Sequence, residues 1–223
     1  MSEPVSINLI RAFTGPRHDR VEDIWHRLAH AWAGQAEVHY FENVGVQRNH
    51  ATCYNEMWRA ELLRPNRYTL FTELDVLPGP NFLDTSILTP ACPIAAAQYC
   101  TRHCGRWTLQ RHPYPGAWYV LIDKEFVHGR LQFNAGGPHN DPANDLHHFL
   151  GNEYGLCVHR LGTEDCYPRH WGCTVERDRA EHLFWSRHWN DPPESRPAGF
   201  PLDQIQAGVD RALAAYEATC PSP

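Results

Sequence analysis

Two acidic side chains, Glu73 and Asp75, follow a run of β-branched and aromatic residues from Tyr68 to Thr72. Such a run is typical of a buried strand, and residues two apart in an extended segment point to the same side. A buried carboxylate without a partner is costly. A hard divalent cation such as Mg²⁺ or Mn²⁺ would be a suitable partner, because it prefers oxygen ligands. The alternative is that both acids are solvated in the turn before Pro78.

The elements that would position these acids alternate along the chain. Apolar runs predict strands, and apolar residues at helical spacing predict helices between them. The resulting order, strand-helix-strand-helix-strand, predicts a parallel sheet flanked by helices. Right-handed crossovers would then bring the carboxyl ends of the strands to one edge, where α/β folds bind ligands. The strands are expected at residues 7–12, 37–41 and 68–71, and the helices at 21–34 and 50–63.

One polar residue interrupts the apolar stripe of the second predicted helix. Ala51, Asn55, Trp58 and Leu62 share one helical face, so Asn55 should point inward, where its amide needs partners. Asn55 either satisfies a loop carbonyl or faces the same sheet edge as the acids. A further apolar stripe, from Leu202 to Tyr216, predicts a closing helix that packs against the core or against a partner copy.

The composition limits the classes of protein to consider. The chain has 223 residues, 42% of them hydrophobic, which predicts one folded domain over 1–223. The net charge of -6 gives no sign of a nucleic-acid-binding protein. No signal peptide and no membrane span are expected, so we predict a cytoplasmic protein with reduced cysteines. Cys100 and Cys104 are interpreted as structural thiols, with zinc binding as the alternative.

A longer segment carries a resemblance to a known family. Residues 45–83, with Asn55 on a helix and Glu73-Leu74-Asp75 at the end of a strand, resemble the core of GT-A-fold, nucleotide-sugar-dependent glycosyltransferases. In that family a D-x-D motif ends the corresponding strand, and here Glu73 replaces its first Asp. The resemblance implies an α/β, Rossmann-like GT-A three-layer sandwich with a mostly parallel central sheet. It also implies a nucleotide-binding half at 1–83, an acceptor and donor-sugar half at 84–175, and a connector with a C-terminal helix at 176–223.

The same resemblance implies donor-binding roles for several residues. Phe13 and Thr14, after the first strand, would contact the base and ribose, although a core Phe is an equal alternative. Asn55 would face the donor site. Arg48 is a candidate diphosphate contact, because a guanidinium fork suits phosphate oxygens, against the default of a solvated arginine.

Metal and catalytic roles follow from the resemblance as well. Asp75 would be the metal ligand, and Glu73 would reach the metal, a metal-bound water or the ribose. His170, before Trp171 and Gly172, would add a third metal or diphosphate contact, with a plain buried histidine as the alternative. Asp145 is the candidate general base of an inverting transfer, and Asp141 is its competitor.

The implied activity is transfer of a sugar from a nucleoside diphosphate sugar to an acceptor hydroxyl. Mn²⁺ or Mg²⁺ would be the cofactor, with a UDP-sugar donor favoured over a GDP-sugar. The acceptor could be a glycan, a small molecule, a protein or a modified DNA base, and the C-terminal helix could form a homodimer. Two alternatives remain: a nucleotidyltransferase-like metal enzyme, and a non-catalytic nucleotide- or glycan-binding protein on the same fold.

Overall fold

The computed structural model describes residues 3–46, 49–98, 115–127, 131–133, 157–167, 169–195 and 199–220. The central sheet has six strands in the order β2-β1-β3-β6-β5-β7. β1 pairs in parallel with both β2 and β3, β6 runs antiparallel to β3 and β5, and β5 and β7 are parallel. These strands are β1 (Val5–Arg11), β2 (Ala36–Glu42), β3 (Tyr68–Glu73), β5 (Ile94–Gln98), β6 (Pro115–Asp123) and β7 (Val158–Leu161).

A second, smaller sheet has the order β4-β10-β9-β8 and is antiparallel throughout. Its strands are β4 (Val76–Pro78), β8 (Thr163–Asp165), β9 (Gly172–Val175) and β10 (Ala180–Leu183). β4 follows β3 after only two residues, so the chain passes from the central sheet into the second sheet directly at the acidic pair.

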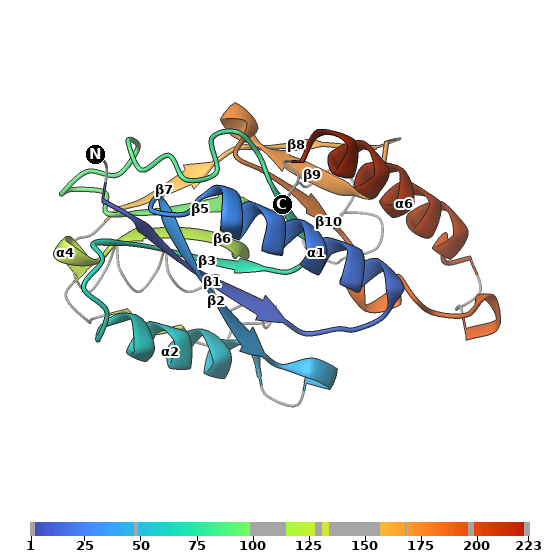
Figure 1. Ribbon diagram of the computed structural model, residues 1–223, viewed down its shortest axis with the longest axis horizontal. Helices are drawn as coiled ribbons and strands as arrows, with labels where there is room; N and C mark the ends of the chain where they lie inside the picture. Colours follow the sequence, from blue (N-terminus) through green and yellow to red (C-terminus); the bar gives the residue numbers. More distant parts are fainter. Residues whose placement is uncertain are drawn as a thin grey trace.

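Helices cover both faces of the central sheet (Figure 1). α1 (Pro16–Ala31) and α6 (Leu202–Thr219) lie on one face, and α2 (His50–Glu61) lies on the other. Short helical segments complete the described chain: α4 (Lys124–Val127), η1 (Val44–Val46), η2 (Glu176–Asp178), η3 (Ser186–His188) and η4 (Pro193–Ser195).

The side-chain alternation of the strands produces two hydrophobic cores. In β5, Ala95 and Ala97 belong to the core beneath α1 and α6, whereas Ile94 and Ala96 belong to the core beneath α2. This period of two is what a strand buried on both faces requires. The predicted three-layer architecture is therefore confirmed.

The predicted elements are confirmed, with shifted boundaries. The first helix begins at Pro16 rather than Val21, because Pro occupies its first turn, where a missing N–H costs nothing. It ends at Ala31, and Gly34 follows with a left-handed φ of 81°. The predicted closing helix is α6, and its apolar stripe, including Ile205 and Val209, packs into the core.

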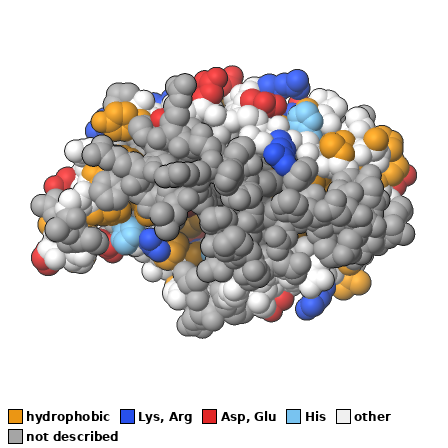
Figure 2. Space-filling model, turned by 180° about the vertical axis from the view of Figure 1, so that it is seen from behind, with side chains coloured by type: hydrophobic (Ala, Val, Ile, Leu, Met, Phe, Trp, Pro, Cys, Tyr) orange, Lys and Arg blue, Asp and Glu red, His pale blue; other side chains and the backbone are white. Residues whose placement is uncertain are grey.

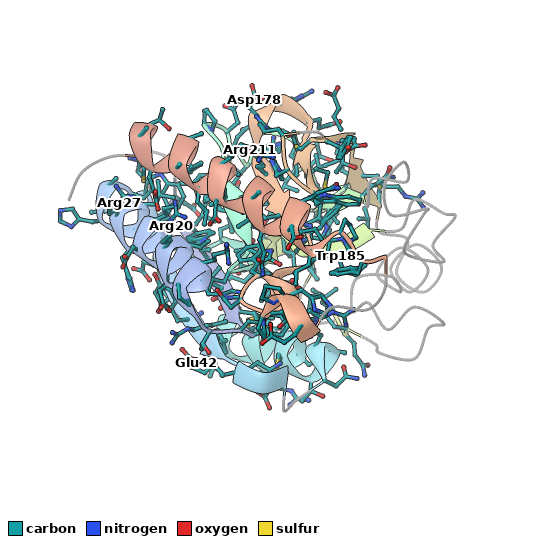
Figure 3. All side chains as sticks on the ribbon, turned by 90° about the vertical axis from the view of Figure 1, so that its right-hand side faces the viewer. Arg20, Arg27, Glu42, Asp178, Trp185 and Arg211 are labelled. Carbon is teal, nitrogen blue, oxygen red and sulfur yellow. The ribbon has the colours of Figure 1, made fainter. Side chains whose placement is uncertain are left out.

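Ion pairs fasten α6 to α1. Arg17 binds Asp210 through Nε and Nη2 at 2.9 and 2.7 Å, and Arg20 binds Glu217 through the same two nitrogens at 2.8 Å each. Figure 3 shows α1 and α6 side by side, with Arg20 on the side of α1 near α6. These bidentate pairs fix the orientation of the two helices that cover one face of the sheet.

Two surface properties bear on the predicted partners. In the described residues, no helix is both long and apolar enough to cross a membrane. On the face seen in Figure 2, the described side chains include both acidic and basic groups around the edge. The described side chains of that face therefore carry charges of both signs.

Candidate metal and donor site

The acidic pair lies at the junction of the two sheets. Glu73 is the last residue of β3, and the N–H of Leu74 still donates to the carbonyl of Ile10 at 3.0 Å. Asp75 precedes β4 directly. The chain turns here from one sheet to the other, so the two carboxylates are held by the ends of two different strands rather than by one extended segment.

A histidine far along the chain completes the group. β10 runs antiparallel to β4 with His182 opposite Val76, and the N–H of Leu183 donates to the carbonyl of Asp75 at 2.9 Å. His182 Nε2 lies 3.6 Å from Asp75 Oδ1. One ligand atom each from Glu73, Asp75 and His182 lies within 4.8 Å of the other two.

The packing around His182 fixes the orientation of its ring. The imidazole stacks on Trp118, with ring centroids 4.5 Å apart and planes at 24°, and contacts the ring of Phe184 edge-on. His182 is 6% exposed. A ring held in this way loses little further freedom when Nε2 binds a ligand.

The donor set fits a divalent cation. Asp75 Oδ1 is buried without a hydrogen-bond partner among the described residues, and an orphaned buried carboxylate oxygen is expensive unless a cation completes it. Two carboxylates and one imidazole are ligands that Mn²⁺ accepts, and Mg²⁺ shares the preference for oxygen. Asp75 and His182 would bind the ion, with Glu73 beside them.

The charge of the site favours ionised Asp75. Burial raises the pKa of this carboxyl, but the charge of His182 and the polar side chains of His182 and Ser186 nearby act against it. The net result is a pKa below the ordinary value. Asp75 is therefore ionised at neutral pH, as a metal ligand must be.

Glu73 has a different environment from Asp75. The hydroxyl of Tyr54 donates to Glu73 Oε1 at 3.5 Å, and His50 Nδ1 lies 3.9 Å from the same oxygen. The Glu73 side chain is 22% exposed, against 8% for Asp75. Glu73 thus faces the open side of the group, where a ligand would arrive.

A small cavity opens beside the acids. Phe13, His18, His50, Glu73 and Asp75 are among the residues that line it. The predicted base contact Phe13 is half-buried there, whereas Thr14 is exposed and its carbonyl accepts from Asn190 Nδ2 at 3.2 Å. The structure therefore brings Phe13, Glu73 and Asp75 together and leaves Thr14 just outside.

Asn55 is placed away from this cavity. Its Nδ2 donates to the carbonyl of Phe133 at 2.7 Å, and its Oδ1 accepts from the N–H of Phe133 at 2.9 Å. Two roles were left open for Asn55, and in the structure its amide hydrogen-bonds to the backbone of a loop residue, Phe133.

His170 belongs to a different group of side chains. It clusters with Cys166 and Glu181, and its Nδ1 lies 3.0 Å from Glu181 Oε1. Burial, followed by the charges of Arg169 and His182, lowers the pKa of His170 to about 3. The structure places His182 beside Asp75, and the role of His170 as a third metal or diphosphate contact stays a prediction.

Several predicted residues lie outside the described part of the chain. These are Arg48, the candidate bases Asp141 and Asp145, and the thiols Cys100 and Cys104. Their roles stay predictions.

The sequence did not single out His182 or His18. With 15 histidines in the chain, residue type alone could not select them. The run from Ala180 to Leu183 has two adjacent polar residues, Glu181 and His182, and no apolar-polar alternation that would have marked His182. The pairing of that run with β4 is a long-range contact that no local pattern encodes.

Among the described residues, a larger cavity of about 770 Å³ does not touch the acidic pair. It lies between the second sheet, the loop after β4 and the C-terminal ends of α1 and α6, lined among others by Trp32, Phe82, Arg169, Glu181 and Tyr216. The larger cavity and the Glu73, Asp75 and His182 group are therefore separate features of the described part of the chain.

No protein-family model and no curated protein sequence matches the chain. Solved structures match its fold. A mannosyltransferase from Pyrobaculum calidifontis, in complex with GDP-Man and Mn2+, has a TM-score of 0.50 at 12% identity, covering 100% of this chain and 77% of that chain.

Two further solved structures have lower scores. The catalytic domain of Drosophila beta1,4galactosyltransferase 7, in complex with xylobiose, has a TM-score of 0.47 at 13% identity, covering 93% of this chain and 83% of that one. Glucosyl-3-phosphoglycerate synthase from Mycobacterium tuberculosis, in complex with Mn2+, UDP and phosphoglyceric acid, has a TM-score of 0.46 at 14% identity. That match covers 99% of this chain and 80% of the other chain. At these identities the likeness is one of fold, and the chain has the GT-A fold.

Proposed function

We propose that this chain, which has the GT-A fold, is a metal-dependent glycosyltransferase that moves a sugar from a nucleoside diphosphate sugar to an acceptor hydroxyl. The observation that carries the proposal is the convergence of Glu73, Asp75 and His182 at the junction of the two sheets. The mannosyltransferase with the same fold was solved with a nucleotide sugar and Mn2+. UDP is our proposed donor nucleotide in preference to GDP, and a cytoplasmic location remains part of the proposal.

Each residue of the group would have a distinct role. Asp75 supplies a buried, ionised carboxylate, and His182 supplies an imidazole held by Trp118. Glu73, on the open side, would contact the donor ribose or a water of the ion. A bound Mn²⁺ or Mg²⁺ would counter the negative charge that builds up on the leaving diphosphate, an effect of several kcal/mol.

The remaining roles rest on the sequence. Phe13 beside the cavity would stack on the nucleotide base, and Arg48 would contact the diphosphate. Asp145, or in its place Asp141, would remove the proton of the acceptor hydroxyl if the configuration inverts.

A calorimetric titration tests the proposal. UDP and GDP are titrated into the protein with and without Mn²⁺, using wild type, Asp75→Asn and, as a matched control, the exposed carboxylate variant Asp23→Asn. We expect nucleotide binding that requires Mn²⁺ in wild type and Asp23→Asn and is lost in Asp75→Asn. Binding that ignores Mn²⁺ and survives Asp75→Asn would overturn the proposal and favour a non-catalytic binding protein.

A donor-hydrolysis screen across nucleotide sugars with Mn²⁺ then identifies the donor. We expect the wild-type protein to hydrolyse one donor and Asp75→Asn to hydrolyse none. Release of pyrophosphate from a nucleoside triphosphate in place of sugar transfer would identify a nucleotidyltransferase instead.

A further inference from the structure

The second sheet carries another group of metal-ligating side chains on its other face. Along β10, neighbouring side chains point to opposite faces, so Glu181 points away from the site that contains His182. Glu181 meets Cys166 and His170 there, and one ligand atom of each lies within 4.8 Å of the other two. We propose that Cys166, His170 and Glu181 form a second metal site, and that its ion is Zn²⁺.

The ligand types favour zinc at this position. A thiol, an imidazole and a carboxylate together form a mixed sulfur, nitrogen and oxygen set, which suits Zn²⁺ in tetrahedral geometry. The first site, with Glu73, Asp75 and His182, contains no sulfur. The two groups therefore differ in chemistry as well as in position.

Unsatisfied polar atoms indicate that the group needs a further partner. His170 is 1% exposed, and neither of its ring nitrogens has a hydrogen-bond partner among the described residues. Glu181 Oε1 is also buried and makes no hydrogen bond of normal geometry; it lies 3.0 Å from His170 Nδ1 and 2.8 Å from Arg169 Nη2, so an arginine now holds the charge that a cation would compensate. An imidazole buried to this extent with both nitrogens unused is costly, and a bound cation would satisfy it.

The backbone holds His170 tightly in place. A Cβ on Gly172 would lie 2.7 Å from His170 Nε2, and a Cβ on Gly208 of α6 would lie 2.9 Å from His170 Cα. The turn that contains His170 is closed by the N–H of Arg169, which donates to the carbonyl of Cys166 at 2.8 Å. Such a rigid placement of ligands lowers the entropy cost of binding an ion.

Access to the group comes from the larger cavity, because Arg169, Thr174 and Glu181 line it. Three protein ligands would leave the fourth zinc position for a water on that side. Cys166 Sγ now contacts the hydroxyl of Thr174 at 2.9 Å, and burial raises the pKa of the thiol. Binding of Zn²⁺ would therefore release one proton from Cys166 as the zinc–sulfur bond forms.

Arg169 is the competing cation. Its Nη2 lies 2.8 Å from Glu181 Oε1 and 3.3 Å from Cys166 Sγ. The Arg169 side chain is 57% exposed, so it can turn into solvent when an ion enters. The proposal predicts that Zn²⁺ displaces it, whereas an arginine-only arrangement would bind no ion.

Cobalt absorption separates this site from the first one. Metal-free protein is titrated with Co²⁺, and the thiolate-to-cobalt charge-transfer band in the near ultraviolet is recorded. We expect wild type to show the band. Cys166→Ser should lose the absorbance that corresponds to one bound Co²⁺ ion per chain, and added Zn²⁺ should displace that ion from wild type. Asp75→Asn and the buried-thiol control Cys53→Ser should both keep the band, because neither residue belongs to this group.

A second variant keeps the test valid if Cys166→Ser fails to fold. Glu181→Gln keeps the thiol and should weaken Co²⁺ binding at least 10-fold, with thermal melting of the metal-free proteins confirming that each variant is folded. Arg169→Ala should bind Co²⁺ at least as tightly as wild type. Equal bands in wild type and Cys166→Ser, or no cobalt binding by wild type, would overturn the proposal, and neither result would affect the test with UDP and Mn²⁺.

Discussion

At the scale of single residues, the members of the group formed by Glu73, Asp75 and His182 differ in how deeply they are buried. Asp75 and His182 are almost fully buried and fixed by their surroundings, whereas Glu73 is partly exposed. In the resemblance drawn from the sequence, Glu73 stands in the place of the first Asp of D-x-D. Its longer side chain lies on the open side of the group, and the buried Asp75 keeps the last place of the motif, so this departure is compatible with the proposed metal site.

The first prediction concerns His182. His182→Asn removes the imidazole next to Asp75 and should lower both Mn²⁺ affinity and kcat/KM of the transfer by about 100-fold, in line with other lost electrostatic contacts at reacting centres. Mn²⁺ affinity is measured by calorimetry and transfer by donor consumption. The exposed variant His30→Asn should behave as wild type. An unchanged Mn²⁺ affinity in His182→Asn would show that this histidine is not a ligand.

The second prediction concerns Asn55. Asn55→Ala leaves the N–H and carbonyl of Phe133 without partners, which should cost about 2 kcal/mol of unfolding free energy. The affinity for Mn²⁺ should not change, because Asn55 does not face the acidic pair. Urea unfolding and calorimetry provide the two readouts, with exposed Thr52→Ala on the same helix as the control. A large loss of Mn²⁺ affinity at unchanged stability would contradict this assignment.

At the scale of elements, a buried carboxylate joins α2 to the central sheet. Glu61 at the end of α2 accepts from Ser6 Oγ at 2.6 Å and from Asn8 Nδ2 at 2.9 Å, both on β1. Arg64 pairs with the same oxygen, and Lys124 Nζ lies 3.4 Å from the other one. These contacts fix the helix that supplies Tyr54 and His50 to Glu73.

The third prediction follows from this network. Burial would raise the pKa of Glu61, but hydrogen bonds from Ser6, Asn8 and Arg64 lower it below the ordinary value of 4.5. Because the folded pKa is depressed, the stabilisation is fully present above pH 4.5 and is lost as the pH falls through the folded pKa. Glu61→Gln should therefore cost about 3 kcal/mol at pH 7, and the difference from wild type should shrink in acid.

Urea unfolding at several pH values measures this difference. The exposed variant Glu164→Gln should stay within about 0.5 kcal/mol of wild type throughout. A cost for Glu61→Gln that is the same at low and neutral pH would contradict an ionised role for Glu61.

The same elements show how much could be predicted from sequence. Periodicity predicted β1, α1, β2, α2 and β3 in order, because each buries a face whose pattern is local. The junction between β3 and β4 was not predicted, since no further strand was expected directly after the acidic pair. His182 was not considered from the sequence for a related reason. Its place beside Asp75 depends on the pairing of β10 with β4, and that pairing is set by tertiary packing.

At the scale of the whole molecule, the candidate site joins two sheets. Glu73 belongs to the central sheet, Asp75 directly precedes β4 of the second sheet, and His182 belongs to β10 of that sheet. An ion held by all three would link the two sheets directly. Binding should therefore stabilise the entire fold rather than one loop.

The fourth prediction uses this link. An ion that binds only the folded state at 100 times its Kd adds about 2.7 kcal/mol to the unfolding free energy. For a chain of this size that corresponds to a rise in Tm of about 5–10 °C. Mn²⁺ should produce this rise in wild type and in Asp23→Asn, and should produce none in Asp75→Asn. Scanning calorimetry at fixed protein concentration measures the shift, and an equal rise in Asp75→Asn would mean that Mn²⁺ binds elsewhere on the fold.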